Sequence, residues 1–269
     1  MGSKVLIQQL SSSVTKSGDS TAPLIPPKLN IEDMSVSFGA KVVVSGFSLS
    51  VTSNSITLLV GGNGTGKSTV LRAVAGIIPS RGRIFFDGVD ITQCSTKERH
   101  KIGISYLVQQ RGVFYRMTVR ENIAFATRGV ARYADDMLEL PCPGSTWAKL
   151  WRKPASDLSI GQQRALAIAM ALNRRPALAL LDEPFAGLSP PVAEELAAYF
   201  SHLVSSEGFT VMLVDHNLQL CSTISDRVYA MQLGAARLLP AGVSAEDIAS
   251  LLLNSDSKNQ PTSATEGGL

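Results

Sequence analysis

The sequence predicts an α/β protein: a mostly parallel sheet flanked by helices, with an antiparallel β subdomain and an inserted helical subdomain. Three observations lead to this fold class. A glycine-rich turn at 61–66 lies between an apolar strand and a helix, and two further apolar runs, 177–181 and 210–214, each end at an acidic residue. Short alternating segments at 29–51 are typical of antiparallel strands. A proline-broken stretch at 111–158 indicates the insertion.

The glycine-rich turn follows the apolar run Ile56–Val60 and has the G-x-x-x-x-G-K-[ST] spacing of a phosphate-binding loop. Glycines let successive backbone N–H groups turn toward a polyanion, and the start of the next helix adds partial positive charge. Lys67 suits the β- and γ-phosphates, and the Ser68 hydroxyl suits Mg²⁺. A glycine-rich turn with a chance lysine is the alternative, but the flanking strand and helix argue against it. The motif predicts a P-loop NTPase core that binds a nucleoside triphosphate through Gly61, Gly62, Asn63, Gly64, Thr65, Gly66, Lys67, Ser68 and Thr69.

Composition excludes several other classes. A net charge of +3 over 269 residues is too small to indicate a nucleic-acid partner. Cys94, Cys142 and Cys221 are scattered, with no spacing typical of zinc or redox sites, so we expect thiols in a reducing compartment. No apolar run approaches the roughly 20 residues that span a bilayer, and the N-terminus lacks a signal-peptide core. We expect a soluble, intracellular protein.

In chain order, residues 1–27 are expected to be a mobile tail, because Ser, Thr, Gly and Pro dominate them. Strands are predicted over 29–38, 42–44, 47–51, 83–86 and 89–91, with turns at the intervening glycines. A short basic helix and the strand 102–108 come next, and another helix starts at 118. A long helix over 158–171, the strand 177–181, an amphipathic helix over 191–205 and the strands 210–214 and 227–231 complete the prediction, with a disordered tail from 253.

Four further signals follow the phosphate loop: Gln109 after a strand, LSIGQ at Leu158–Gln162, an apolar strand ending in Asp182-Glu183-Pro184, and His216 after another strand. In this order and at these separations, the chain resembles the ATP-binding cassette (ABC) ATPases over roughly residues 29–250. The resemblance implies a nucleotide-binding core at 28–110 and 165–252, with a helical subdomain at 111–164 that carries the signature segment. It also implies that ATP and Mg²⁺ are the cofactors.

The resemblance implies a role for each acidic and polar residue. Asp182 faces the metal, although a structural ion pair is its alternative role. Glu183 is the general base or water-orienting group. Gln109 touches Mg²⁺ and the attacking water, with Gln110 as an adjacent competitor. His216 contacts the γ-phosphate, although a lone histidine is ordinarily a surface or core residue.

The signature segment implies a dimer. Ser159 and Gly161 precede a long helix, and in the family that helix start, with Gln162, completes the nucleotide site of a head-to-tail partner. Ile160 departs from the usual glycine, and Ser189 replaces the family's D-loop aspartate, which leaves the coupling across the dimer in doubt. Phe38 matches the aromatic position that stacks on adenine; a half-buried strand aromatic is the alternative.

Residues 101–125 resemble the ATPases of branched-chain amino acid importers and of related exporters for lipid-like cargo. This implies a subunit peripheral to the cytoplasmic face of the membrane, docked on a separate permease, with an identical or different second ATPase and a solute-binding protein as further partners. A soluble ABC ATPase of the iron–sulfur assembly type and a regulator without hydrolytic activity are alternatives. The intact Lys67, Asp182, Glu183 and His216 argue against the regulator.

Overall fold

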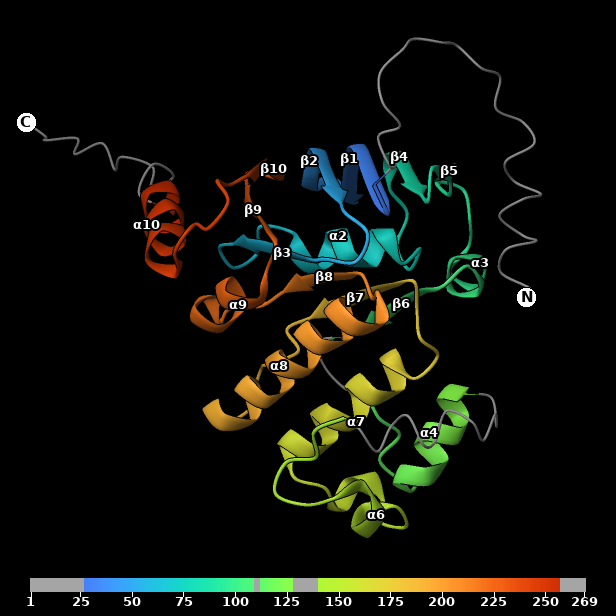
Figure 1. Ribbon diagram of the computed structural model, residues 1–269. Coiled ribbons are helices and arrows are strands. Elements are labelled where there is room, and N and C mark those ends of the chain that lie inside the picture. The colour runs from blue at the N-terminus through green and yellow to red at the C-terminus, as the bar shows by residue number, and fades with distance from the viewer. Residues whose placement is uncertain (1–26, 109–111, 128–139, 257–269) are drawn as a thin grey trace, which may run out of the picture.

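The computed structural model describes residues 27–108, 112–127 and 140–256. Figure 1 shows two sheets with one helix between them and further helices packed beneath the larger sheet. The strands are β1 (Leu29–Phe38), β2 (Lys41–Val51), β3 (Ile56–Gly61), β4 (Arg81–Phe86), β5 (Val89–Asp90), β6 (Ile104–Leu107), β7 (Leu178–Asp182), β8 (Val211–Val214), β9 (Arg227–Gln232) and β10 (Ala235–Leu238). The helices are α2 (Lys67–Val74), α3 (Thr96–Lys101), α4 (Val119–Thr127), α6 (Trp147–Leu150), α7 (Ile160–Leu172), α8 (Pro190–Glu207), α9 (Leu218–Ile224) and α10 (Ala245–Asp256), with a 3-10 turn at Ala155–Asp157.

The larger sheet has the strand order β10-β9-β3-β8-β7-β6, in which only the edge strand β10 runs antiparallel. The carboxyl ends of β3, β8 and β7 therefore meet at one edge, where ligands bind in open parallel sheets. The smaller sheet, β2-β1-β4-β5, is antiparallel throughout. Both sheets agree with the predicted fold class.

Both faces of the larger sheet are covered. Leu59 packs with α2 and the antiparallel sheet, whereas its neighbours Leu58 and Val60 pack with α7, α8 and α9 on the other face. Every residue of β3 is buried for this reason. A strand with two covered faces has a continuous apolar run instead of an alternating one, and this run is what made the strands of the core predictable.

One predicted turn is wrong. Gly46, expected to separate two strands, lies within the continuous strand β2. The pairs Met34–Phe47 and Val36–Val44 leave two residues of β2 opposite one residue of β1, and Gly46 has φ +63°. This is a bulge that glycine permits, and it bends the strand without ending it.

The C-terminal part of the chain holds more structure than predicted. β9, expected as the last strand, is followed by β10, and the helices α9 and α10 were not anticipated. Helix α10 continues to Asp256, so the expected boundary at 252 is too early. Residues 1–26 and 257–269 of the two predicted tails lie outside the described residues.

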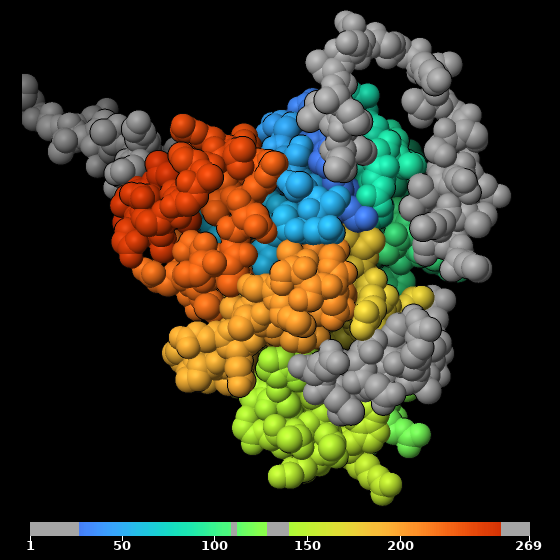
Figure 2. All heavy atoms as spheres, in the orientation of Figure 1, coloured from blue at the N-terminus to red at the C-terminus, as the bar shows by residue number. Residues whose placement is uncertain are grey.

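Helices α4 and α6 form a lobe beneath the core with the start of α7, and Figure 2 shows the described part of this lobe in yellow-green. Helix α7 crosses the expected subdomain boundary at residue 164 and packs on both α4 and β6. The division into a core and a helical subdomain stays a prediction. Among the residues that the structure describes, no helix has the length and apolar character needed to cross a bilayer.

A buried arginine secures the end of α2. Arg99 on α3 is 3% exposed and donates hydrogen bonds of 2.8 and 2.9 Å to the carbonyls of Ala73 and Val74, and others to Thr92 and Cys94. The carbonyls of Ala73 and Val74 lie in the last turn of α2, where the helical hydrogen-bond pattern leaves acceptors unsatisfied.

Replacing Arg99 by methionine should lower the free energy of unfolding by about 2–4 kcal/mol, because several buried carbonyls lose their donors at once. Urea denaturation followed by circular dichroism measures the change. The control is Arg83→Met, which removes an arginine that is 65% exposed and paired with Glu32; its effect should stay below about 1 kcal/mol. Equal midpoints for the two variants would contradict the bracing role of Arg99.

Candidate functional site

The phosphate loop joins β3 to α2, and glycine is required at both of its ends. A Cβ at Gly61 would lie 2.7 Å from the carbonyl oxygen of Met231 in the neighbouring strand, and Gly66 has φ +103°. The loop also braces itself, because Thr65 Oγ1 donates to the Gly62 carbonyl at 2.9 Å. Between these points the backbone at Asn63 and Gly64 is exposed. The loop is therefore braced at both ends and open to solvent between them, which suits a backbone that receives an anion.

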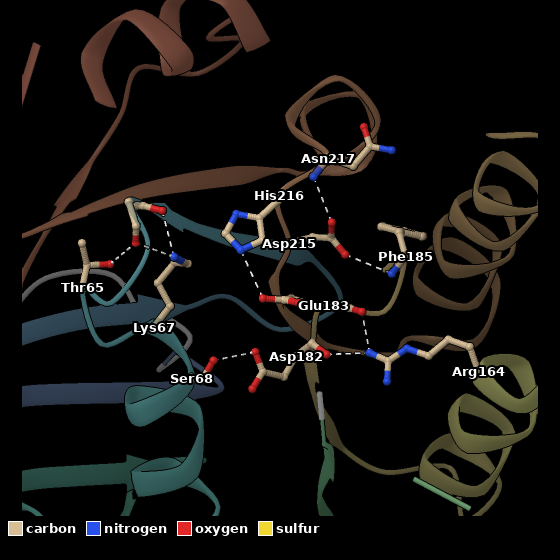
Figure 3. Close-up of polar contacts among 12 residues, drawn as sticks. Thr65, Lys67, Ser68, Arg164, Asp182, Glu183, Phe185, Asp215, His216 and Asn217 are labelled. Carbon is tan, nitrogen blue, oxygen red and sulfur yellow. Dashed lines mark hydrogen bonds and ion pairs between the residues drawn. The ribbon is translucent and has the colours of Figure 1, made fainter. Parts of the chain in front are cut away.

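Lys67 is the first residue of α2 and only 6% exposed. Its Nζ donates to the carbonyl oxygens of Gly61 and Gly62, at 2.8 Å each (Figure 3). Burial lowers the pKa of the Lys67 ammonium below its ordinary value, and the carboxylates of Glu183 and Asp182 act in the opposite direction. A buried cation beside exposed backbone donors favours an anionic ligand, because such a ligand would replace the lost hydration.

Ser68 in the first turn of α2 contacts Asp182 at the end of β7. Ser68 Oγ donates to Asp182 Oδ1 at 2.9 Å, and Tyr106 Oη on β6 donates to the other oxygen, Oδ2, at 3.0 Å. Burial raises the pKa of Asp182 above its ordinary value, and these two hydrogen bonds oppose that rise. Burial also raises the pKa of Tyr106 to about 12, so its hydroxyl stays protonated as a donor. A serine hydroxyl beside a carboxylate is an oxygen pair that fits Mg²⁺.

Glu183 and His216 form the second contact of the site. His216 Nε2 lies 3.1 Å from Glu183 Oε1, an ion pair whenever the imidazole is protonated. Glu183 has φ +50°, a backbone conformation that side chains other than glycine rarely adopt. Its N–H donates to the Val214 carbonyl at 2.7 Å, which extends the β7–β8 pairing past Asp182.

Asp215 joins the two turns that carry these residues. The buried carboxylate accepts from the N–H of Phe185 at 3.0 Å through one oxygen and from the N–H of Asn217 at 2.9 Å through the other. In Figure 3 it lies between the chain segments that carry Glu183 and His216. Because one side chain fixes both turns, the spacing of Glu183 and His216 is set by the backbone and not by their mutual contact alone.

The signature residues lie at the start of α7, in the lower lobe of Figure 1. Ser159 caps the helix: its Oγ accepts from the N–H of Gln162, and Gln162 Oε1 accepts from the N–H of Ser159. Gln162 Nε2 donates to the Pro143 carbonyl at 2.9 Å. The side chain of Gln162 thus braces the helix start, while Ser159 and Ile160 face solvent, Ile160 being 73% exposed.

A model of the ABC transporter family matches residues 44–186, which span the phosphate loop, the signature and Asp182-Glu183. The chain belongs to this family. It is an ABC transporter ATPase, and its fold, with two sheets and the accompanying helices, is that of the ABC cassette.

Three curated relatives carry different cargo names. The sulfate/thiosulfate import ATP-binding protein CysA of Thermosynechococcus vestitus is 36% identical over 77% of this chain, and the match spans 62% of CysA. The probable branched-chain amino acid transport ATP-binding protein LivF of Archaeoglobus fulgidus is 36% identical over 68% of this chain and 79% of its own. The lipopolysaccharide export system ATP-binding protein LptB of Haemophilus influenzae is 32% identical, with shares of 80% and 90%. Among solved structures, a nucleotide-free ATP-binding cassette from an ABC transporter superposes with a TM-score of 0.72 at 26% identity, covering 87% of this chain and 98% of that one.

The structure of this ABC ATPase gathers five of the predicted polar and charged site residues at the carboxyl edge of the larger sheet: Lys67, Ser68, Asp182, Glu183 and His216. Phe38 is 53% exposed at the end of β1, while Val43 and Val44 of the paired strand lie against Gly66. Gln109 and its competitor Gln110 lie outside the described residues. Ser159, Gly161 and Gln162 contact each other, Pro143 and Leu188 instead of the phosphate loop.

Three residues of the site were not anticipated: Tyr106, Asp215 and Arg164. Each acts through a partner remote in sequence, and two of them bond main-chain atoms, so no spacing rule marks them. The one available signal is at Asp215, an acidic residue directly after a buried strand.

Proposed function

We propose that this ABC chain binds MgATP at the carboxyl edge of its larger sheet and that Glu183 activates the water that attacks the γ-phosphate. The observation that carries the proposal is the pair of contacts Ser68–Asp182 and Glu183–His216 beside the phosphate loop. Mg²⁺ held by Ser68, Asp182 and Gln109 would neutralise phosphate charge. Lys67 pairs with the β- and γ-phosphates, His216 contacts the γ-phosphate, and Phe38 stacks on adenine.

The second proposed element is a head-to-tail dimer with an identical or different ATPase. Ser159 and Gly161 lie at the start of a helix of 13 residues, where Ser159 and Ile160 are exposed, and this helix start would contribute to the partner's nucleotide site. The exposed Ile160 and the contact of Gly161 with Leu188 lie on the same surface, so the dimer interface would include both segments.

A permease is the proposed membrane partner, and its cytoplasmic segment would dock in a groove of about 1100 Å³ between α3, β6 and α7. Phe114 and Phe125 line the groove and pack edge to face, with ring centroids 4.6 Å apart. Both side chains remain exposed, by 43% and 61% respectively. Exposed paired aromatics favour a protein partner. The groove also includes Tyr106 and Val108, the described residues leading to Gln109, which would couple docking to the nucleotide site.

The proposed cargo is an amino acid or a similar small solute, taken up with the help of a solute-binding protein. The likeness of residues 101–125 to branched-chain amino acid importers and the match to LivF support this class. CysA also carries import in its name. The match to LptB favours export of lipid-like cargo as the second candidate.

Reconstitution in liposomes tests the proposal. The chain is combined with a permease and a solute-binding protein of the amino acid import class, and ATP hydrolysis is measured with and without amino acids. Amino acids should raise the hydrolysis rate several-fold, and the Glu183→Gln variant should abolish the response. Stimulation by lipid-like cargo alone would contradict import of small solutes. Recovery of the chain with an iron–sulfur scaffold and no permease would contradict transport.

A further inference from the structure

Arg164 on α7 is a buried side chain that donates hydrogen bonds to several main-chain oxygens. It is 8% exposed, and its guanidinium donates to the carbonyls of Asp182 at 2.6 Å, Glu183 and Pro184 at 3.2 Å. A fourth bond of 3.0 Å goes to the Val108 carbonyl at the end of β6. Figure 3 shows the guanidinium facing the Asp182–Glu183 main chain.

These bonds hold the backbone at Glu183, which is one of six described non-glycine residues with a positive φ. Glu183 has φ +50°, which costs an acidic residue of order 1–3 kcal/mol and persists only where neighbouring groups hold it. Its N–H is bonded to Val214, its carbonyl to Arg164, and the N–H of Phe185 to Asp215. Arg164 is the member of this set that comes from the signature helix.

The chemistry of Arg164 suits a positioning role. Burial lowers the pKa of the Arg164 guanidinium, and the largest opposing influence on that pKa is the Asp215 carboxylate. Its planar fork fixes several acceptors in one geometry, which an ammonium cannot reproduce. The side chain therefore ties α7 to the turn that carries Glu183 and to Val108, the residue before Gln109.

We propose that Arg164 is a positioning residue for hydrolysis: it couples the placement of the signature helix to the direction in which the Glu183 carboxylate points. The proposal rests on the proposed role of Glu183. When the start of α7 moves against a partner's nucleotide, the same rigid helix shifts the carbonyls that Arg164 holds. The base of one site would thus respond to occupation of the other.

The test compares Arg164→Met with Arg164→Lys in the full chain. Arg164→Met should lower kcat about 10²-fold while KM for ATP changes less than about 3-fold, because a misdirected base affects the transition state more than binding. Arg164→Lys should recover part of kcat. Amide exchange at Phe185 and Ala186 should speed up in Arg164→Met, a readout independent of turnover.

Arg99→Met is the matched control, because Arg99 is equally buried and also bonds four carbonyls, but outside the site. It should lower the melting temperature while kcat stays within about 2-fold of the parent and exchange at Phe185 is unchanged. If Arg164→Met behaves like Arg99→Met in both readouts, Arg164 is only structural and the proposal is overturned.

A double variant separates the two proposals. In a Glu183→Gln background, adding Arg164→Met should lower the residual rate less than about 2-fold, because Arg164 acts through Glu183. A further fall comparable to that of the single variant would overturn the coupling. Glu183→Gln alone, if it hydrolyses ATP at the parental rate, overturns the role of Glu183 itself.

Discussion

Glu183→Gln will bind ATP as the parent does but hydrolyse it at least about 10²-fold more slowly, because an amide cannot accept the proton of the attacking water. The side chains are nearly isosteric, and the backbone bonds of Glu183 to Val214 and Arg164 do not involve the carboxylate. ATP should consequently persist between two chains and trap the dimer. Phosphate release gives the rate, and gel filtration with MgATP gives the oligomeric state.

The matched control is Glu195→Gln, which makes the same chemical change on an exposed position of α8. It should leave rate and oligomeric state unchanged. A Glu183→Gln protein with parental turnover, or one that stays monomeric with MgATP at saturating concentration, would refute the assignment of the base or of the trapped dimer respectively.

Lys67→Ala will weaken ATP binding by more than about 10²-fold, because it removes the ammonium that bonds the loop carbonyls of Gly61 and Gly62, on a residue that is only 6% exposed. Fluorescence titration with a labelled nucleotide measures the dissociation constant. The fold should survive, since Lys67 bonds only to Gly61 and Gly62 of its own loop. Unchanged ATP affinity would exclude Lys67 from phosphate binding.

Lys97→Ala provides the comparison, because Lys97 is an exposed lysine on α3. Its affinity for ATP should equal that of the parent. A circular dichroism melt of both variants distinguishes lost binding from lost folding: Lys67→Ala should melt within a few degrees of Lys97→Ala, and a collapse of Lys67→Ala alone would indicate that the lysine holds the loop together.

The core strands were predictable because strands buried on both faces consist of consecutive apolar residues. β3, β7 and β8 have no exposed residue, so their runs are almost wholly apolar. Asp182, the last residue of β7, and Asp215, the residue after β8, mark the edge of the sheet where the site lies. Contacts between β3, β7 and β8 then follow from parallel pairing alone.

The rest depended on contacts that spacing does not encode. Tyr106 reaches Asp182 from 76 positions away, and Arg164 bonds carbonyls, which every residue has. Gln162 was predicted to bind nucleotide, yet its side chain serves a capping box, a local competition that the motif hides. Gly46 shows the same limit, since a glycine permits both a turn and a bulge.

The left-handed backbone at Glu183 sets thermal stability against catalytic activity. Glycine or asparagine tolerates φ +50° at lower cost, so a search for heat-resistant forms would favour either one there. Such a variant would have a higher melting temperature but would lack the carboxylate proposed for ATP hydrolysis. A screen that selects only for thermal stability would therefore enrich inactive variants. The conformational cost at Glu183 is the stability that the fold gives up for activity.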